Sequence, residues 1–211
     1  MEPNKADKQT AETVRAGDAA ARARRTESDP AQERRLAAIM FSDICGYSRI
    51  MGRNEKHAIR LLARHDAMVA EAMTRFDGHI IKRLGDGFLA EFRSAVSAVE
   101  CALAIQRRMQ SYNQNAAEDD IFQVRIGVHL GDVVVTNDDI LGDGVNVAAR
   151  IEPLAPPGGI CISQDIYNQV LNKVEMQVVA LEPTQLKNIE RQIGIYRVLL
   201  AAAAVPPPPL P

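Results

Sequence analysis

Long hydrophobic runs are missing from this sequence, and so is any marked excess of one charge. No apolar stretch approaches the roughly 18 residues that a membrane-spanning helix needs, and no secretory signal pattern is visible. The 25 lysine and arginine residues nearly balance 27 aspartate and glutamate residues, for a formal net charge of −2. A cationic surface for nucleic acid is therefore not indicated. We expect a cytoplasmic protein with no membrane segment in this chain and no nucleic acid partner.

Cysteine is also scarce, and two familiar signatures are absent. Cys45, Cys101 and Cys161 are odd in number and show none of the short spacings of a zinc site. They are expected to be reduced thiols, as is usual in the cytoplasm. No Gly-Lys-Ser/Thr sequence is present, which excludes a Walker-type phosphate loop. No internal repeat is visible, so a repeat architecture is not expected either.

Length and composition indicate one domain between two tails. The 211 residues are 46% hydrophobic, which suffices for one hydrophobic core. Residues 1–35 are charged and lack an apolar stripe, so we expect a flexible segment, or alternatively a helix docked against a partner. Residues 36–199 carry the apolar patterns of the expected domain. Residues 200–211 are rich in alanine and proline, typical of a stiff tail or of a linker to a further regulatory domain.

Two aspartates follow short apolar patterns that are typical of β-strands. Residues 36–41 are an apolar run before Asp43, and residues 79–84 lead into the Gly-Asp-Gly turn that contains Asp86. Carboxylates at neighbouring strand ends can hold two divalent cations across a reacting phosphate, and oxygen ligands favour Mg²⁺ or Mn²⁺ over zinc. The plainer interpretation is that Asp43 caps the following helix and Asp86 is an ordinary turn residue.

The residues after Asp43 favour a site for phosphate. The chain continues as Ile44-Cys45-Gly46-Tyr47-Ser48, with a glycine that permits close approach of a ligand to the backbone. A helix beginning at Gly46 and Tyr47 would direct its backbone N–H groups toward phosphate oxygens held by a metal ion.

A third polar group interrupts the apolar stretch within residues 139–150. Asn146 and Arg150 are four residues apart and lie on one face of a helix that would begin near Gly142. An amide and a planar cation one turn apart can bind a sugar and a pentavalent phosphate. The alternative, a surface arginine paired with a nearby acid, does not explain the asparagine. Asp143 is expected to cap the same helix.

Five motifs in sequence extend these observations over most of the chain. FSDICGYS, IIKRLGDGFLAEF, VRIGVHLGDVVV, DDILGDGVNVAARIE and LKNIERQIGIYRV span residues 41–198. In this order they resemble the catalytic domain of class III nucleotidyl cyclases, of the bacterial adenylate cyclase type. The resemblance implies an α+β fold, with a ferredoxin-like βαββαβ-based mixed sheet flanked by helices. It also implies a head-to-tail homodimer whose active sites are shared between the two subunits.

The resemblance assigns roles to the metal and phosphate ligands. Asp43 and Asp86 match the family's two metal-binding aspartates, and the backbone carbonyl of Ile44 matches a further ligand. Two Mg²⁺ or Mn²⁺ ions are implied in each active site. Arg125 and Lys187 match basic residues near the β- and γ-phosphates.

The resemblance also assigns residues that contact the nucleoside and the transition state. Lys82 matches the lysine that reads the adenine ring, and Asp139 matches the acid that accepts from the exocyclic amine. The adjacent Asp138 is an alternative reader, because the register of this loop is open. Asn146 matches the residue that orients the ribose, and Arg150 matches the residue that stabilises the pentavalent phosphate.

Within the implied homodimer, these residues divide between the two subunits. One subunit would contribute Asp43, Asp86 and Arg125, and the other Lys82, Asp139, Asn146, Arg150 and Lys187. The substrate would be ATP, because a lysine donor and an aspartate acceptor complement adenine. The expected activity is that of an adenylate cyclase, forming 3′,5′-cyclic AMP and pyrophosphate.

Three alternatives remain open at this point. Guanylate cyclases of this family resemble one another in placing glutamate at the Lys82 position, so a guanylate cyclase is the nearest enzymatic alternative. A regulatory domain that binds nucleotide without turnover is the second, although every expected role-bearing residue is present. The third, a dimerisation module, leaves the polar residues unexplained. The Gly-Gly-Asp/Glu-Glu-Phe signature of diguanylate cyclases is absent.

Overall fold

A computed structural model describes residues 33–136, 139–182, 186–187, 189 and 191–200. The expectations for residues 1–32, for Asp138 and for the Ala/Pro-rich residues 201–211 therefore lie outside the described residues. No helix in the described part of the chain is long and apolar enough to cross a membrane. The three cysteines are free thiols, as expected.

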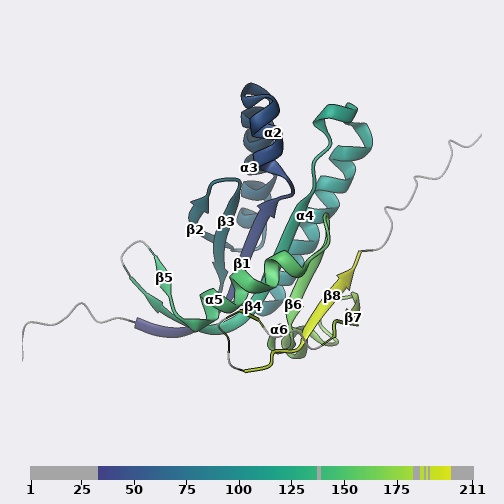
Figure 1. The fold of residues 1–211 in the computed structure, drawn as a ribbon. Helices are drawn as coiled ribbons and strands as arrows, with labels where there is room; N and C mark the ends of the chain where they lie inside the picture. The colour runs from purple at the N-terminus through teal and green to yellow at the C-terminus, as the bar shows by residue number, and fades with distance from the viewer. Residues whose placement is uncertain (1–32, 137–138, 183–185, 188, 190, 201–211) are drawn as a thin grey trace, which may run out of the picture. The chain divides into compact units, whose positions relative to one another are not determined.

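The domain is built on one mixed sheet flanked by helices, which confirms the expected α+β fold (Figure 1). The 8-stranded sheet has the order β2-β3-β1-β4-β6-β8-β7, and β5 pairs with β4 outside this path. The elements are β1 (Glu33–Ile44), α2 (Tyr47–Arg53), α3 (Glu55–Arg75), β2 (His79–Leu84), β3 (Gly87–Phe92), α4 (Ala95–Asn115), η1 (Glu118–Asp120), β4 (Val124–Val135), β5 (Ile140–Leu141), α5 (Asp143–Ile151), η2 (Glu152–Leu154), β6 (Ile160–Ser163), α6 (Gln164–Val170), β7 (Gln177–Ala180) and β8 (Ile195–Leu199).

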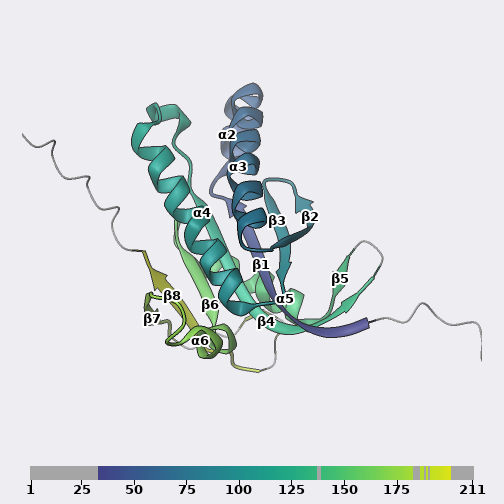
Figure 2. The same ribbon diagram turned by 180° about the vertical axis from the view of Figure 1, so that it is seen from behind.

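Both faces of the central strand β1 are buried, because its residues alternate between two hydrophobic clusters. Ala38 and Met40 belong to the main core with α3, α4 and α6. Ala37 and Ile39 belong to a smaller cluster that includes residues of α5. Figure 1 shows α5 in front of the sheet, and Figure 2 shows α3 and α4 covering the opposite face. Burial on both faces holds β1 firmly, so the residues at its end have a rigid support.

The β2–β3 hairpin brings its turn against the end of β1. Leu84 pairs with Gly87 across a two-residue turn formed by Gly85 and Asp86, and β3 continues antiparallel to β1. A Cβ atom at Gly87 would lie 1.9 Å from the carbonyl oxygen of Ser42, so only glycine permits this approach. The close contact places the turn beside the carboxyl end of β1.

Helix α5 begins at Asp143, close to the predicted start near Gly142. The N-cap is Gly142, which has no side chain to accept a hydrogen bond, and Asp143 is the first residue inside the helix. The expectation that Asp143 caps this helix is therefore wrong. Its carboxylate lies 3.8 Å from Arg191 instead, and both side chains are largely exposed.

Candidate functional site

Asp43 and Asp86 lie near each other at the rim of the sheet, although they are 43 positions apart along the chain. Burial raises the pKa of Asp86, and the negative charge of nearby Asp43 raises it further. The two negative charges repel each other, and a cation bound between the carboxylates would relieve this repulsion. Asp43 does not cap a helix, because α2 begins at Tyr47 with Gly46 as its cap and no side-chain cap hydrogen bond.

The segment between Asp43 and helix α2 presents backbone rather than a side chain. Gly46 is exposed, and a Cβ atom there would meet nothing within 4 Å. Tyr47 is buried in the main core. Burial raises the pKa of the Tyr47 phenol, with a smaller contribution from the charge of Asp86. The tyrosine therefore anchors the segment beneath the site, and the part of this segment that is open to a ligand is the backbone at Gly46.

Arg125 on β4 connects Asp43 with a residue that the sequence analysis missed. Its Nη2 donates a hydrogen bond of 2.8 Å to Asp43 Oδ2, and its Nε lies 3.0 Å from Glu152 Oε1. The hydrogen bond to Asp43 is the largest cause of the raised pKa of Arg125. Glu152 is the last residue of the fourth motif, DDILGDGVNVAARIE. An acidic residue so close to Arg150 was the feature of the sequence that could have pointed to it.

Burial dominates the electrostatics of Glu152. Its side chain is only 12% exposed, and burial raises the pKa of the carboxyl to about 7 even though Arg125 lowers it. The negative charges of Asp43 and Asp86 act in the same direction as burial. The guanidinium group of Arg125 therefore contacts the carboxylates of Asp43 and Glu152, and its charge also acts on Asp86.

The buried Glu152 carboxyl makes the stability of the metal-free protein depend on pH. Because its pKa is about 7 in the folded state against an ordinary 4.5, the folded state binds this proton more tightly than the unfolded chain does. The stabilisation is complete below the unfolded pKa and is lost as the pH rises through the folded pKa. We expect the free energy of unfolding to fall by about 1–3 kcal/mol from this group between about pH 5 and about pH 8.

Urea denaturation of the wild type and of Glu152→Gln at both pH values measures this contribution. The comparison isolates Glu152, because all other titrating groups are common to the two proteins. We expect the variant to lose less stability than the wild type over this interval. Equal losses in the two proteins would show that Glu152 does not carry the pH dependence.

Lys82 and Asp139 form an ion pair within one chain. Lys82 Nζ donates to Asp139 Oδ2 at 2.6 Å, and the other carboxylate oxygen of Asp139 accepts from the Ile140 backbone N–H at 2.8 Å. The hydrogen bond from Lys82 lowers the pKa of Asp139. The structure thus presents a cationic donor and an anionic acceptor together, from β2 and from the residue just before β5. Asp138, the alternative acceptor, lies outside the described residues.

Asn146, Arg150 and Lys187 are not joined to the other predicted residues. All three are exposed. Within the described ranges, no hydrogen bond or ion pair is present at the side chain of Asn146, Arg150 or Lys187. Asn146 and Arg150 both lie on α5, as the four-residue spacing predicts. Two cations and an amide therefore face solvent without a partner among the residues that the structure describes.

The donor set fits Mg²⁺ or Mn²⁺ that arrives together with a phosphate ligand. No group of three or more histidine, cysteine or acidic side chains suited to a metal occurs among the described residues. The Asp43 and Asp86 carboxylates and the Ile44 carbonyl are hard oxygen donors at one rim, too few to enclose a cation. Mg²⁺ typically binds one or two carboxylates and completes its coordination with water and substrate phosphates. These residues suit that mode of binding.

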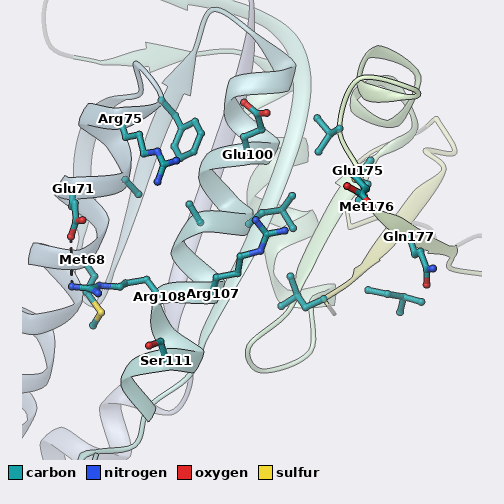
Figure 3. Close-up of a pocket in the computed structure, with 17 residues that line it drawn as sticks. Met68, Glu71, Arg75, Glu100, Arg107, Arg108, Ser111, Glu175, Met176 and Gln177 are labelled. Atoms are coloured by element: carbon teal, nitrogen blue, oxygen red, sulfur yellow. Dashed lines mark ion pairs between the residues drawn. The ribbon is translucent and has the colours of Figure 1, made fainter. Parts of the chain in front are cut away.

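A separate hollow of about 1060 Å³ lies between α3, α4 and the segment around β7 (Figure 3). Its lining mixes charged side chains such as Glu71, Arg75 and Arg108 with the apolar Met68 and Met176. None of the predicted site residues lines it. The candidate site is thus an open rim and not this hollow.

Known proteins share the sequence and the fold of this chain. A family model described as "Adenylate and Guanylate cyclase catalytic domain" matches residues 30–199. The chain is 46% identical over 187 residues to "Putative adenylate cyclase 3" of Rhizobium meliloti (strain 1021), covering 84% of this chain and 32% of that protein. It is 30% identical to an adenylate cyclase of Glutamicibacter nicotianae over 177 residues, or 82% of this chain and 42% of that protein. The chain thus spans less than half the length of these relatives.

Solved structures agree with this result. The crystal structure of an adenylate/guanylate cyclase/hydrolase from Silicibacter pomeroyi has a TM-score of 0.74 and 39% identity, covering 79% of this chain and 98% of that one. The adenylyl cyclase CyaB from P. aeruginosa shares the fold, with a TM-score of 0.72 and 23% identity over 82% of this chain and 98% of that one. The sequence match over residues 30–199 and this shared fold show that the chain belongs to the adenylate and guanylate cyclase catalytic domain family.

Proposed function

We propose that this chain is an adenylate cyclase domain that converts ATP to 3′,5′-cyclic AMP and pyrophosphate. The observation that carries the proposal is the convergence of Asp43, Asp86 and Arg125 at one rim of the sheet. Two carboxylates suited to hard cations lie there beside a guanidinium group, which is the donor set that a triphosphate requires. Relatives named as adenylate cyclases support the reaction class.

In this proposal, Asp43, Asp86 and the Ile44 carbonyl hold two Mg²⁺ or Mn²⁺ ions. When bound, such ions lower the pKa of the 3′-hydroxyl and neutralise charge on the phosphates. Because Asp43 is then needed as a metal ligand, Arg125 would give up its hydrogen bond to Asp43 and donate to the β- and γ-phosphates instead. Gly46 leaves the backbone before α2 open to the same phosphates.

The remaining residues act on the nucleoside and on the transition state. Lys82 donates to the adenine ring, and Asp139 accepts from its amino group. Asn146 orients the ribose so that the 3′-oxygen faces the α-phosphorus in line with the departing pyrophosphate. Arg150 places positive charge where negative charge accumulates on the pentavalent phosphorus, so it contributes mainly in the transition state.

The proposed arrangement is a head-to-tail homodimer with two shared sites. Its support is that, among the described residues, no hydrogen bond or ion pair joins Asp43, Asp86 or Arg125 to Asn146, Arg150 or Lys187. Arg125 contacts Asp43, whereas Asn146, Arg150 and Lys187 have no described partner at all. A second copy that faces the first would bring these cations to the nucleotide. Residues 36–199 are proposed as the catalytic domain, and strand β1 extends it back to Glu33. Residues 200–211 are proposed to lie outside it.

Incubation of the purified chain with Mn²⁺ and either ATP or GTP tests the proposed function directly. Cyclic AMP from ATP, in excess over cyclic GMP from GTP, is the expected product. Preferential formation of cyclic GMP would reject the proposed reading of Lys82 and Asp139. Absence of product from both nucleotides, with the chain shown to be dimeric, would favour a regulatory domain without turnover.

Substitution of Lys82 by methionine should weaken the preference for ATP. The variant keeps an apolar stem of similar length but removes the donor to the adenine ring and the ion-pair partner of Asp139. One lost polar contact of about 1–3 kcal/mol corresponds to a decrease of roughly 10–100-fold in the ratio of kcat/KM for ATP to that for GTP. Steady-state kinetics with both nucleotides measure this ratio.

Arg83→Met is the matched control for this experiment. Arg83 is the next residue on β2 and is also a cation in an ion pair, with Asp66. We expect its substitution to leave the nucleotide preference unchanged. An equal loss of preference in both variants would indicate a general disturbance of β2 and not a role in reading the base.

A further inference from the structure

Arg125 is shared between two carboxylates, and the two contacts differ in quality. Nη2 makes an aligned hydrogen bond of 2.8 Å with Asp43. Nε lies 3.0 Å from Glu152 Oε1, yet neither atom has an aligned hydrogen-bond partner among the described residues. Both atoms are buried. In the arrangement in which Arg125 is bonded to Asp43, Nε is thus close enough to Glu152 Oε1 for a second hydrogen bond but is not aligned for it.

The backbone holds Glu152 in a fixed place beside Arg125. Glu152 is the C-cap residue of α5, and its N–H donates to the carbonyl of Ala148. A Cβ atom at Gly127 would lie 2.4 Å from the backbone nitrogen of Glu152 and 2.6 Å from its Cα. Gly127 is two residues after Arg125 on β4, so both are on the same face of that strand. The glycine makes room for Glu152 directly beside Arg125.

Of the two carboxylates that contact Arg125, Asp43 is the more exposed. Its side chain is 32% exposed at the rim, against 12% for Glu152. The proposed function also requires Asp43 as a metal ligand, whereas it gives Glu152 no metal to bind. When Asp43 is engaged by a metal ion, Arg125 retains one carboxylate within hydrogen-bonding distance.

We propose that Glu152 is a positioning residue that anchors Arg125 through Nε and so directs its two Nη groups toward the phosphates of the nucleotide. This inference rests on the proposed function of Arg125. Asp43 is the exchangeable partner and Glu152 the permanent one. The planar guanidinium presents its donors in a fixed fork, so an anchor at Nε sets the direction of the remaining donors. Without the anchor, the arginine would sample other rotamers and bind phosphate less well.

Binding of Mn²⁺-tripolyphosphate, measured by calorimetry, tests this role without any turnover. We expect Glu152→Ala to weaken binding about tenfold, as is typical when the partner of a ligand-binding group is removed. Arg125→Ala should weaken it at least as much. In the double variant, loss of Glu152 should have no further effect, because its action passes through Arg125. Glu152→Gln keeps an oxygen acceptor for Nε, so it should recover part of the loss.

Glu91→Ala is the matched control, because Glu91 is similarly buried, with a 13% exposed side chain, and is paired with Arg35 at 2.6 Å. It should bind tripolyphosphate normally. The positioning role would be overturned if Glu152→Ala bound tripolyphosphate normally. It would also be overturned if the loss of affinity in the Glu152/Arg125 double variant equalled the product of the losses in the two single variants. If Glu152→Ala fails to fold, the same cycle with Glu152→Gln decides the question. If the effects of Glu152 and Arg125 on tripolyphosphate binding are coupled but the chain forms no cyclic nucleotide, the proposed function is rejected and the positioning role of Glu152 stands.

Discussion

Replacement of Arg150 by alanine should lower kcat by about 10³-fold and leave the KM for ATP nearly unchanged. An arginine that stabilises charge on a transferring phosphoryl group contributes about 10³–10⁵ in kcat. Because Arg150 is exposed, we expect a contribution near the lower limit of this range. The effect falls on kcat because the interaction forms mainly in the transition state. Arg150 is exposed and unpaired in the described structure, so its removal breaks no internal contact.

Initial rates over a range of ATP concentrations separate kcat from KM for this variant. Arg108→Ala is the control, because Arg108 is also an exposed arginine on a helix and lies 3.8 Å from Glu71. It should retain the wild-type kcat. A wild-type kcat in Arg150→Ala would contradict the proposed role, and a large rise in KM alone would indicate ground-state binding instead.

Replacement of Asp43 by alanine should lower activity by about 10³-fold or more. Metal ions supply several kcal/mol of stabilisation to a developing phosphoryl charge, and each 1.36 kcal/mol is a factor of about ten in rate. The substitution removes a proposed metal ligand and also the hydrogen-bond partner of Arg125 Nη2. Asp43→Asn should be nearly as inactive, although its amide oxygen can still accept from Arg125.

Cyclic AMP formation as a function of Mn²⁺ concentration measures this loss. The control is Asp120→Ala, which removes an exposed carboxylate on η1 that lies 3.6 Å from His57. High Mn²⁺ should restore little activity to either Asp43 variant, because the ligand itself is missing. Activity within tenfold of the wild type would show that Asp43 does not hold a metal ion required for the reaction.

Mixing the two inactive proteins tests whether the sites are shared. A mixed dimer of Asp43→Ala and Arg150→Ala has one site with both substitutions and one with neither, if the two residues come from different subunits. Random exchange of equal amounts would then restore about a quarter of the wild-type activity, because half of the dimers each contain one intact site. No recovery, with mixed dimers shown to form, would reject the shared arrangement.

Local patterns predicted the parts of the site that depend on neighbours in the chain. The apolar run before Asp43 and the turn around Asp86 placed both carboxylates at strand ends, where the structure also has them. The spacing of Asn146 and Arg150 placed both on one helix, as observed. The start near Gly142 also agrees with the structure, but the cap is Gly142 and not Asp143, because the spacing of apolar residues defines the face of a helix more sharply than its end.

Contacts between distant segments were not readable from local patterns. The Lys82–Asp139 ion pair joins residues 57 positions apart, and the Arg125–Asp43 hydrogen bond joins residues 82 positions apart. Family resemblance named these four residues but not their mutual contacts. Glu152 was missed altogether, because its place depends on the close approach of η2 to Gly127.

By itself, the sequence determined the family, the strand-end aspartates and the helical face of Asn146 and Arg150. These features follow from residue order and from the periods of strands and helices, which are properties of the local backbone. Only the tertiary structure decided that Asp43 and Glu152 share Arg125. The order of strands in the sheet and the glycines at close backbone contacts bring these groups together, and neither is encoded in the spacing of the residues concerned.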